Sequence, residues 1–193
     1  MKNNRLLDLV IKINALKASK THTAEREETF SLLYRNYARG VFNSVWRITN
    51  NYAETEDIVQ EAFCVAFEQI DRLREPDNFG GWIKRIALNK AISYLRSRKI
   101  VLTNNEDMLD TPDENPDTEK EIMEQSRVED VKAAIQALPD GFRTIVSMYL
   151  LDNIPQEEIA AMLGVSHSTV RSQYHRAKKK ILASLKDKSY HEK

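Results

Sequence analysis

The sequence predicts an all-α protein made of two small helical domains that are joined by an acidic flexible linker. Apolar residues recur at spacings of three and four in several segments, and no alternating strand pattern of useful length occurs. The chain of 193 residues contains only five glycines and five prolines, a composition that suits helices. Its length is compatible with one domain or with two small ones.

An N-terminal extension, residues 1–24, precedes the first predicted domain. Residues 4–18 carry apolar side chains at helical spacing with lysines among them, which predicts a short amphipathic helix. The extension lacks the small-residue cleavage site of a signal peptide. No apolar run reaches the roughly 18 residues of a membrane span. We therefore expect a cytoplasmic protein without direct membrane insertion.

The first predicted domain covers residues 25–100. Asn50 and Asn51 interrupt its apolar periodicity, and a loop rich in charge and turn-forming residues follows further on, at 72–81. Three helices are predicted, from near Glu27 to the Asn50-Asn51 break, over about 53–70, and over about 82–99.

Residues 101–126 form the predicted linker. The segment is strongly acidic and holds few large apolar side chains, so it cannot bury enough surface to offset its ordering entropy. It is also too long for an ordinary loop inside one domain. Helical periodicity resumes in a second predicted domain, residues 127–188, and a short tail, 189–193, ends the chain.

The second domain contains the pattern of two short helices joined by a tight turn, at residues 155–180. Gly164 falls at the turn, where a positive φ is needed. Ala160 lets the second helix approach, Val170 lies on its inner face, and Ser166 can cap its N-terminus. This is the helix-turn-helix pattern, whose second helix enters the DNA major groove. The alternative is an ordinary basic helical hairpin.

The outward face of that second helix carries the side chains that we expect to contact DNA. Arginine can donate two hydrogen bonds to guanine, and serine can reach a base or a phosphate. Other basic residues neutralise phosphates without reading sequence. The predicted DNA-binding residues are Ser168, Arg171, Ser172, His175, Arg176 and Lys179.

A second basic stripe is predicted on the helix at 82–99. Arg85, Asn89 and Arg96 share one side of this helix, with Trp82 and Ser93 beside them. Guanidinium groups pair with phosphates and aromatic rings stack on unpaired bases, so the stripe suits single-stranded nucleic acid. The alternative is a solvated basic face with Trp82 in the core.

The helix at 53–70 has an acidic side instead, which includes Asp57, Gln60 and Glu61. No histidine accompanies these acids, so we predict neither a metal site nor a cofactor. A protein-docking face and a merely solvated face are the two interpretations. Cys64, the only cysteine, is expected to be half-buried and structural.

Two sets of motifs, taken together, resemble a known family. The segments Ala53-Glu-Thr-Glu-Asp-Ile-Val-Gln-Glu-Ala-Phe63 and Phe79-Gly-Gly-Trp-Ile-Lys-Arg-Ile-Ala-Leu-Asn-Lys-Ala-Ile-Ser-Tyr-Leu-Arg96 resemble the second conserved region of sigma-70-family factors. Leu138-Pro-Asp-Gly-Phe-Arg143 and the segment 158–178 resemble the fourth region. A chain of this length with only these regions resembles an extracytoplasmic-function sigma factor, over about 25–100 and 127–188.

The resemblance implies a role for each face. Asp57, Gln60 and Glu61 would dock on the clamp helices of the RNA polymerase β′ subunit. The outward face of the helix-turn-helix would read the promoter's minus-thirty-five element. The residues implied to bind and melt the minus-ten element are Asn78, Phe79, Trp82, Arg85, Asn89 and Arg96.

The implied partners are core RNA polymerase, through its β and β′ subunits, promoter DNA, and a separate anti-sigma factor. The acidic linker would thread near the polymerase active-site channel. Two positions depart from the family pattern, since glycine often stands where Ser168 does and an acid where Ser93 does.

Three other classes of protein compete with this interpretation. A sigma mimic would titrate an anti-sigma factor without binding promoters, but the basic recognition helix argues against it. A dimeric helix-turn-helix repressor would not need the segment 53–99. An enzyme is the least favoured class, because the sequence shows no nucleophile–base pair and no metal-ligand cluster.

Overall fold

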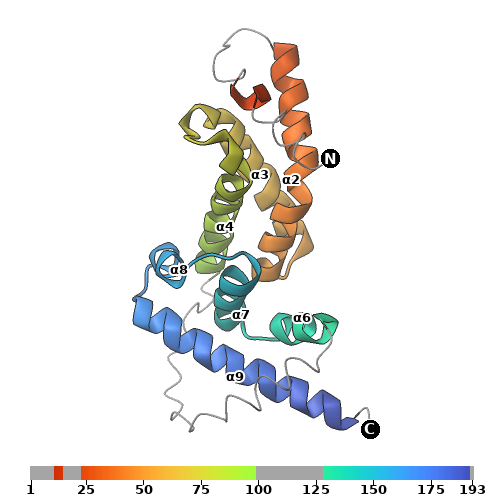
Figure 1. The fold of residues 1–193 in the computed structure, drawn as a ribbon, viewed down its shortest axis with the longest axis vertical. Coiled ribbons are helices and arrows are strands. Elements are labelled where there is room, and N and C mark those ends of the chain that lie inside the picture. The colour runs from red at the N-terminus through yellow and green to blue at the C-terminus, as the bar shows by residue number, and fades with distance from the viewer. Residues whose placement is uncertain (1–10, 15–22, 99–127, 192–193) are drawn as a thin grey trace. The chain divides into compact units, whose positions relative to one another are not determined.

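The computed structural model describes residues 11–14, 23–98 and 128–191, and the chain divides into two compact units, Met1–Tyr94 and Leu95–Lys193 (Figure 1). All regular structure in the described residues is helical, which confirms the all-α class. The predicted linker and most of the N-terminal extension lie outside the described residues. The predicted domain boundaries therefore stay predictions.

In the described part of the first unit, three long helices and two short 3₁₀ turns follow the helical residues 11–14. These are α2 (Thr23–Thr49), α3 (Tyr52–Glu68), η1 (Ile70–Arg72), η2 (Pro76–Asn78) and α4 (Phe79–Ser97), whose last turn falls in the second unit. Figure 1 shows α2 and α3 lying side by side.

The break between α2 and α3 follows from its two asparagines. Asn50 takes a positive φ of 49°, a conformation that asparagine tolerates better than most residues. Asn51 caps α3, because its side-chain oxygen accepts a hydrogen bond from the backbone N–H of Glu54 at 3.3 Å. The predicted break at these residues is confirmed.

The core of the first unit is formed by the apolar stripes of its three helices. Phe63 of α3 is buried and makes ring contacts with Tyr34 and Phe67, at centroid distances of 4.8 and 5.7 Å. The other buried apolar residues include Val41, Val45, Ile48, Ile58, Ala62, Ile83, Ala87, Leu88, Ala91 and Ile92. These spacings of three and four confirm the helical periodicity.

The segment between α3 and α4 differs from its prediction. Residues 72–81 were expected to be a loop, but η1, η2 and the first turn of α4 include most of them. The helix begins at Phe79 rather than near Trp82 because Phe79 is an apolar anchor, fully buried against Tyr37 at 5.2 Å between ring centroids. Gly80 permits this close packing, since a Cβ atom there would lie 2.8 Å from the Tyr37 ring.

Part of the N-terminal extension packs on α2. Residues 11–14 are helical, Ile13 is buried, and Lys12 forms an ion pair with Glu28 at 3.6 Å. The opposite characters of Ile13 and Lys12 agree with an amphipathic helix. The rest of 4–18 lies outside the described residues.

Within residues 128–191, the second unit contains four α-helices and a π-helical turn. They are α6 (Val128–Gln136), α7 (Asp140–Val146), η3 (Ser147–Leu151), α8 (Gln156–Leu163) and α9 (His167–His191). Figure 1 shows α9 as the long helix against which α6, α7 and α8 pack. Its helix continues into the predicted tail.

A buried arginine stabilises the start of α7. Arg143 is only 4% exposed, donates a hydrogen bond to the carbonyl oxygen of Leu138 at 2.8 Å, and forms an ion pair with Asp140. A buried charge is stable only when it is paired and hydrogen-bonded in this way. The arginine thereby fixes the turn at Pro139 between α6 and α7.

Within the described ranges, no helix combines the length and the apolar character that a membrane crossing requires. In the same part of the chain, no three or more metal-ligating side chains converge on one point.

Candidate nucleic-acid interfaces

The turn between α8 and α9 has the geometry that the sequence predicts. Gly164 adopts a φ of 66° and ends α8, and the next N–H, from Val165, donates to the carbonyl oxygen of Ala160 at 3.0 Å. Ser166 accepts a hydrogen bond from the backbone N–H of Thr169 at 3.0 Å and so caps α9. Ala160 and Val170 are buried. The helix-turn-helix is confirmed.

The inner face of α9 packs on the core of the second unit. Val170, Ala177, Ile181 and Leu185 are buried, as predicted. Tyr174 lies edge-on to Tyr149 at 4.9 Å between ring centroids, and burial raises the pKa of the Tyr174 phenol. The helix therefore has one fixed orientation within its unit.

The outer face of α9 begins with exposed side chains and continues with partly buried ones. Ser168, Arg171 and Ser172 are exposed, and His175, Arg176 and Lys179 are half-buried. The Ser168 and Ser166 hydroxyl oxygens lie 2.8 Å apart, and Ser172 donates to the carbonyl oxygen of Thr169 at 3.0 Å. Ser172 keeps its acceptor lone pairs for a ligand.

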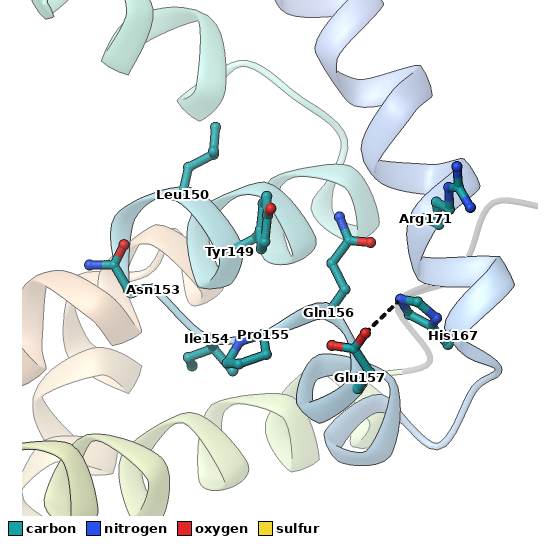
Figure 2. A pocket seen from close by; sticks show the side chains of 9 residues that line it. All are labelled: Tyr149, Leu150, Asn153, Ile154, Pro155, Gln156, Glu157, His167 and Arg171. Carbon is teal, nitrogen blue, oxygen red and sulfur yellow. Dashed lines mark ion pairs between the residues drawn. The ribbon is translucent and has the colours of Figure 1, made fainter.

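A pocket of about 700 Å³ lies beside the N-terminal end of α9 (Figure 2). Figure 2 shows Glu157 of α8 and His167 of α9 turned toward each other, with 3.4 Å between Nε2 of His167 and Oε1 of Glu157. Arg171 lies on the same wall of the pocket, one turn further along α9. The pair joins the two helices of the motif next to the predicted base-reading arginine. No feature of the sequence singled it out.

The stripe on α4 is presented at the surface of the helix. Arg85, Asn89 and Arg96 are exposed, as is Ser93, whose hydroxyl donates to the carbonyl oxygen of Asn89 at 2.9 Å. Asn78, the last residue of η2, is exposed just before the helix begins. Trp82 is half-buried. An aromatic ring among amides and guanidinium groups suits unpaired bases and their phosphates.

Phe79 is a correction to the predicted minus-ten set. The side chain is fully buried, so it has no surface to offer to a nucleotide. Its ring lies 5.2 Å from Tyr37 and 6.0 Å from Trp82, between centroids. The buried Phe79 ring therefore packs against the Trp82 ring and helps to position it. Its apolar character was the signal for this role, since phenylalanine is among the residues most often fully buried.

The acidic stripe on α3 is exposed along its length. Asp57, Gln60 and Glu61 are all exposed and follow one another at helical spacing. Cys64 lies further along the same side and is exposed, which corrects the expectation of a half-buried thiol. The stripe therefore presents carboxylate and amide groups, followed by one exposed thiol.

A cleft of about 500 Å³ separates the acidic stripe of α3 from the α4 stripe. Its lining residues are Glu54, Asp57, Ile58, Glu61, Asn89, Lys90, Ser93 and Tyr94. Lys90 of α4 spans the cleft and donates to Glu61 of α3 at 2.9 Å. The sequence did not single out Lys90, because its partner lies 29 residues away.

Comparison with known proteins agrees with this architecture. The model of sigma-70 region 2 matches residues 33–100, and that of sigma-70 region 4 matches residues 117–181. The chain is 30% identical over 166 residues to the ECF RNA polymerase sigma-E factor of Escherichia coli K12, and the alignment covers 80% of this chain and 85% of that protein.

Two further likenesses extend the comparison. The ECF RNA polymerase sigma factor SigE of Mycolicibacterium smegmatis is 34% identical over 154 residues, which cover 77% of this chain but 58% of that longer protein. The sigma factor RpoE of Bartonella quintana, solved with the anti-sigma factor NepR, superposes with a TM-score of 0.53 at 19% identity, over 81% of this chain and 96% of that one.

The two region models together cover most of the chain, in the order that the motifs predicted. The fold is thus that of a two-domain sigma factor. The chain belongs to the sigma-70 family, among its extracytoplasmic-function members.

Proposed function

We propose that this chain binds core RNA polymerase and directs initiation at specific promoters. The observation that carries the proposal is the presence of two DNA-compatible faces of different character in one chain. The α9 face offers exposed Arg171 and Ser172 on a helix-turn-helix. The α4 face offers a half-buried Trp82 among exposed Arg85 and Asn89. One face suits a duplex groove and the other suits an opened strand.

The α4 face would bind and melt the minus-ten element. An unstacked base can stack on Trp82, while Arg85 and Arg96 neutralise phosphates and Asn78 and Asn89 hydrogen-bond to base edges. Melting then becomes a matter of binding, because the contacts to the flipped base offset the stacking that the duplex loses.

The α9 face would read the minus-thirty-five element as duplex DNA. Arg171 can donate two hydrogen bonds to a guanine, and Ser168 and Ser172 lie on the same exposed side. His175, Arg176 and Lys179 follow along the helix, where they can neutralise phosphates.

The acidic stripe of α3 would dock on the clamp of the polymerase β′ subunit, with Asp57, Gln60 and Glu61 as its contacts. Their exposure leaves them available to a partner. A separate anti-sigma factor is a further expected partner, a kind of protein with which the Bartonella quintana RpoE was solved.

Reconstituted transcription tests this function. The purified full chain is added to bacterial core RNA polymerase and a promoter library, and specific initiation is expected with the chain but not without it. The exposed Cys64 should also become protected from maleimide labelling when core polymerase binds, because it lies on the acidic stripe. Absence of transcription together with tight binding to an anti-sigma factor would favour a sigma mimic instead.

A further inference from the structure

A single lysine lies between the acidic stripe of α3 and the α4 stripe. Lys90 Nζ lies 2.9 Å from Glu61 Oε2, and the two side chains are 31% and 66% exposed. Lys90 directly follows Asn89, so it projects about 100° around α4 from the nucleic-acid side, toward α3. It can therefore reach either stripe by a change of side-chain rotamer.

The cleft between α3 and α4 gives this lysine two possible partners. Among the described residues that line the cleft, Lys90 is the only base, and three carboxylates face it from α3, those of Glu54, Asp57 and Glu61. Asn89 and Ser93 line the opposite wall and belong to the α4 stripe. The ammonium group of Lys90 thus lies in a cleft that borders both the acidic stripe of α3 and the α4 stripe.

We propose that Lys90 is a further DNA-contacting residue of the α4 stripe, and that Glu61 controls its availability. In the free chain Lys90 is paired with Glu61. This proposal rests on the proposed function. When a basic side chain of the polymerase occupies Glu61, Lys90 loses its partner and turns to a phosphate of the strand held against Asn89. Polymerase binding and DNA binding then strengthen each other, and the coupling is reciprocal.

The energetics permit this exchange. An ion pair with both partners partly exposed is weak, so its loss changes an equilibrium by about two- to fivefold. A lysine–phosphate contact in its place releases counterions. On a single strand, each such contact adds about 0.7 to the slope of log affinity against log salt concentration. The exchange of Glu61 for a phosphate therefore requires little free energy, and the salt dependence of DNA binding reports it.

The first test measures the salt dependence of DNA binding by the assembled holoenzyme. The probe is a single-stranded oligonucleotide that carries the nontemplate minus-ten element. We expect Lys90→Met to reduce the magnitude of the salt slope by about 0.7 and Lys90→Arg to restore it. Lys12→Met is the matched control, because Lys12 is 34% exposed and paired with Glu28 but lies on another element. An unchanged slope for Lys90→Met would overturn the proposal.

The second test uses the free full chain and a single-stranded oligo(dT) probe. Glu61→Gln releases Lys90, so we expect this variant to bind oligo(dT) about two- to fivefold more tightly than wild type. The double variant Lys90→Met/Glu61→Gln should not show this gain. Asp57→Asn removes an equal charge from the same cleft but leaves the Glu61–Lys90 ion pair in place. Equal gains for Glu61→Gln and Asp57→Asn would mean that only net charge matters, and the proposal would fail.

The two tests separate failure of this inference from failure of the proposed function. If the wild-type chain supports specific initiation but Lys90→Met keeps the wild-type salt slope, only the role of Lys90 is refuted. If the wild-type chain forms no holoenzyme, the proposed function falls, and the oligo(dT) measurement still decides whether Glu61 holds Lys90 back from nucleic acid.

Discussion

The first unit presents opposite charges on neighbouring helices, whereas the helix-turn-helix of the second unit presents a basic face. On α3 and α4, Asp57 and Asn89 line one cleft, and the Glu61–Lys90 pair joins its walls. On α9, the exposed Ser168, Arg171 and Ser172 lie on a helix fixed by its own core and N-cap. Under the proposed function, the first unit would couple a protein partner to DNA, and the second unit would read a rigid duplex.

The largest expected effect comes from reversing charge on the acidic stripe. Asp57 is exposed, so Asp57→Lys should leave the fold intact while it places like charges at the polymerase contact. We expect core polymerase affinity to fall by about 2–5 kcal/mol. Binding of the free chain to a duplex minus-thirty-five probe should not weaken. Competition binding to core polymerase measures the first quantity, and unchanged affinity there would remove Asp57 from the docking face.

The next effect concerns the aromatic ring of the α4 stripe. Trp82→Ala should reduce promoter opening by about 10- to 100-fold, because a base stacked on an aromatic ring contributes about 1–3 kcal/mol. Trp82→Phe keeps a ring above Phe79 and should retain most of the activity. Fluorescence of a base analogue in the minus-ten element reports opening. If Trp82→Ala opens promoters as fast as wild type, Trp82 is only a core residue.

On α9, base reading and phosphate binding should separate. Arg171→Ala should reduce discrimination at one minus-thirty-five base pair by about 1–3 kcal/mol, because a bidentate contact to guanine is lost. Lys179→Ala, two turns further along the helix, should weaken all sequences equally and lower the salt slope by about 0.9. Affinities for a series of minus-thirty-five probes with single-base substitutions, measured at several salt concentrations, test both effects. A uniform loss with Arg171→Ala would make Arg171 a phosphate contact.

The smallest effect tests how the α4 stripe is positioned. A Cβ atom on Gly80 would meet the Tyr37 ring at 2.8 Å, so Gly80→Ala should destabilise the first unit by about 1–2 kcal/mol. Gly40→Ala is the control, because nothing lies within 4 Å of its Cβ position, and it should stabilise α2 by about 0.5–1 kcal/mol. Denaturant unfolding gives both values. If both substitutions changed the free energy of unfolding in the same direction, the contact between Gly80 and Tyr37 would not explain the result.

Local spacing was sufficient to predict the helix-turn-helix. Gly164, Ala160, Val170 and Ser166 each act within one or two turns of the chain, where backbone conformation and capping decide the structure. The Asn50-Asn51 break followed for the same reason. The exposure of Asp57, Gln60 and Glu61 also agrees with their helical spacing.

Tertiary packing accounts for what the sequence did not predict. Phe79 lies at the right position for the α4 stripe, but the depth of the Tyr37 contact decides that it is buried. Nothing in the local sequence distinguishes Lys90, because its partner Glu61 comes close only when α3 packs beside α4. The buried Arg143 and the Glu157–His167 pair likewise depend on neighbours that spacing alone does not identify.

The most direct test of a division of labour between α4 and α9 measures the affinity of two variants for each of two DNA probes. Holoenzymes carrying Trp82→Ala or Arg171→Ala are titrated with a single-stranded minus-ten oligonucleotide and with a duplex minus-thirty-five probe. We expect Trp82→Ala to weaken binding of the single-stranded probe alone and Arg171→Ala to weaken binding of the duplex probe alone. Equal weakening of both probes by either variant would contradict a division of duplex reading and strand capture between α9 and α4.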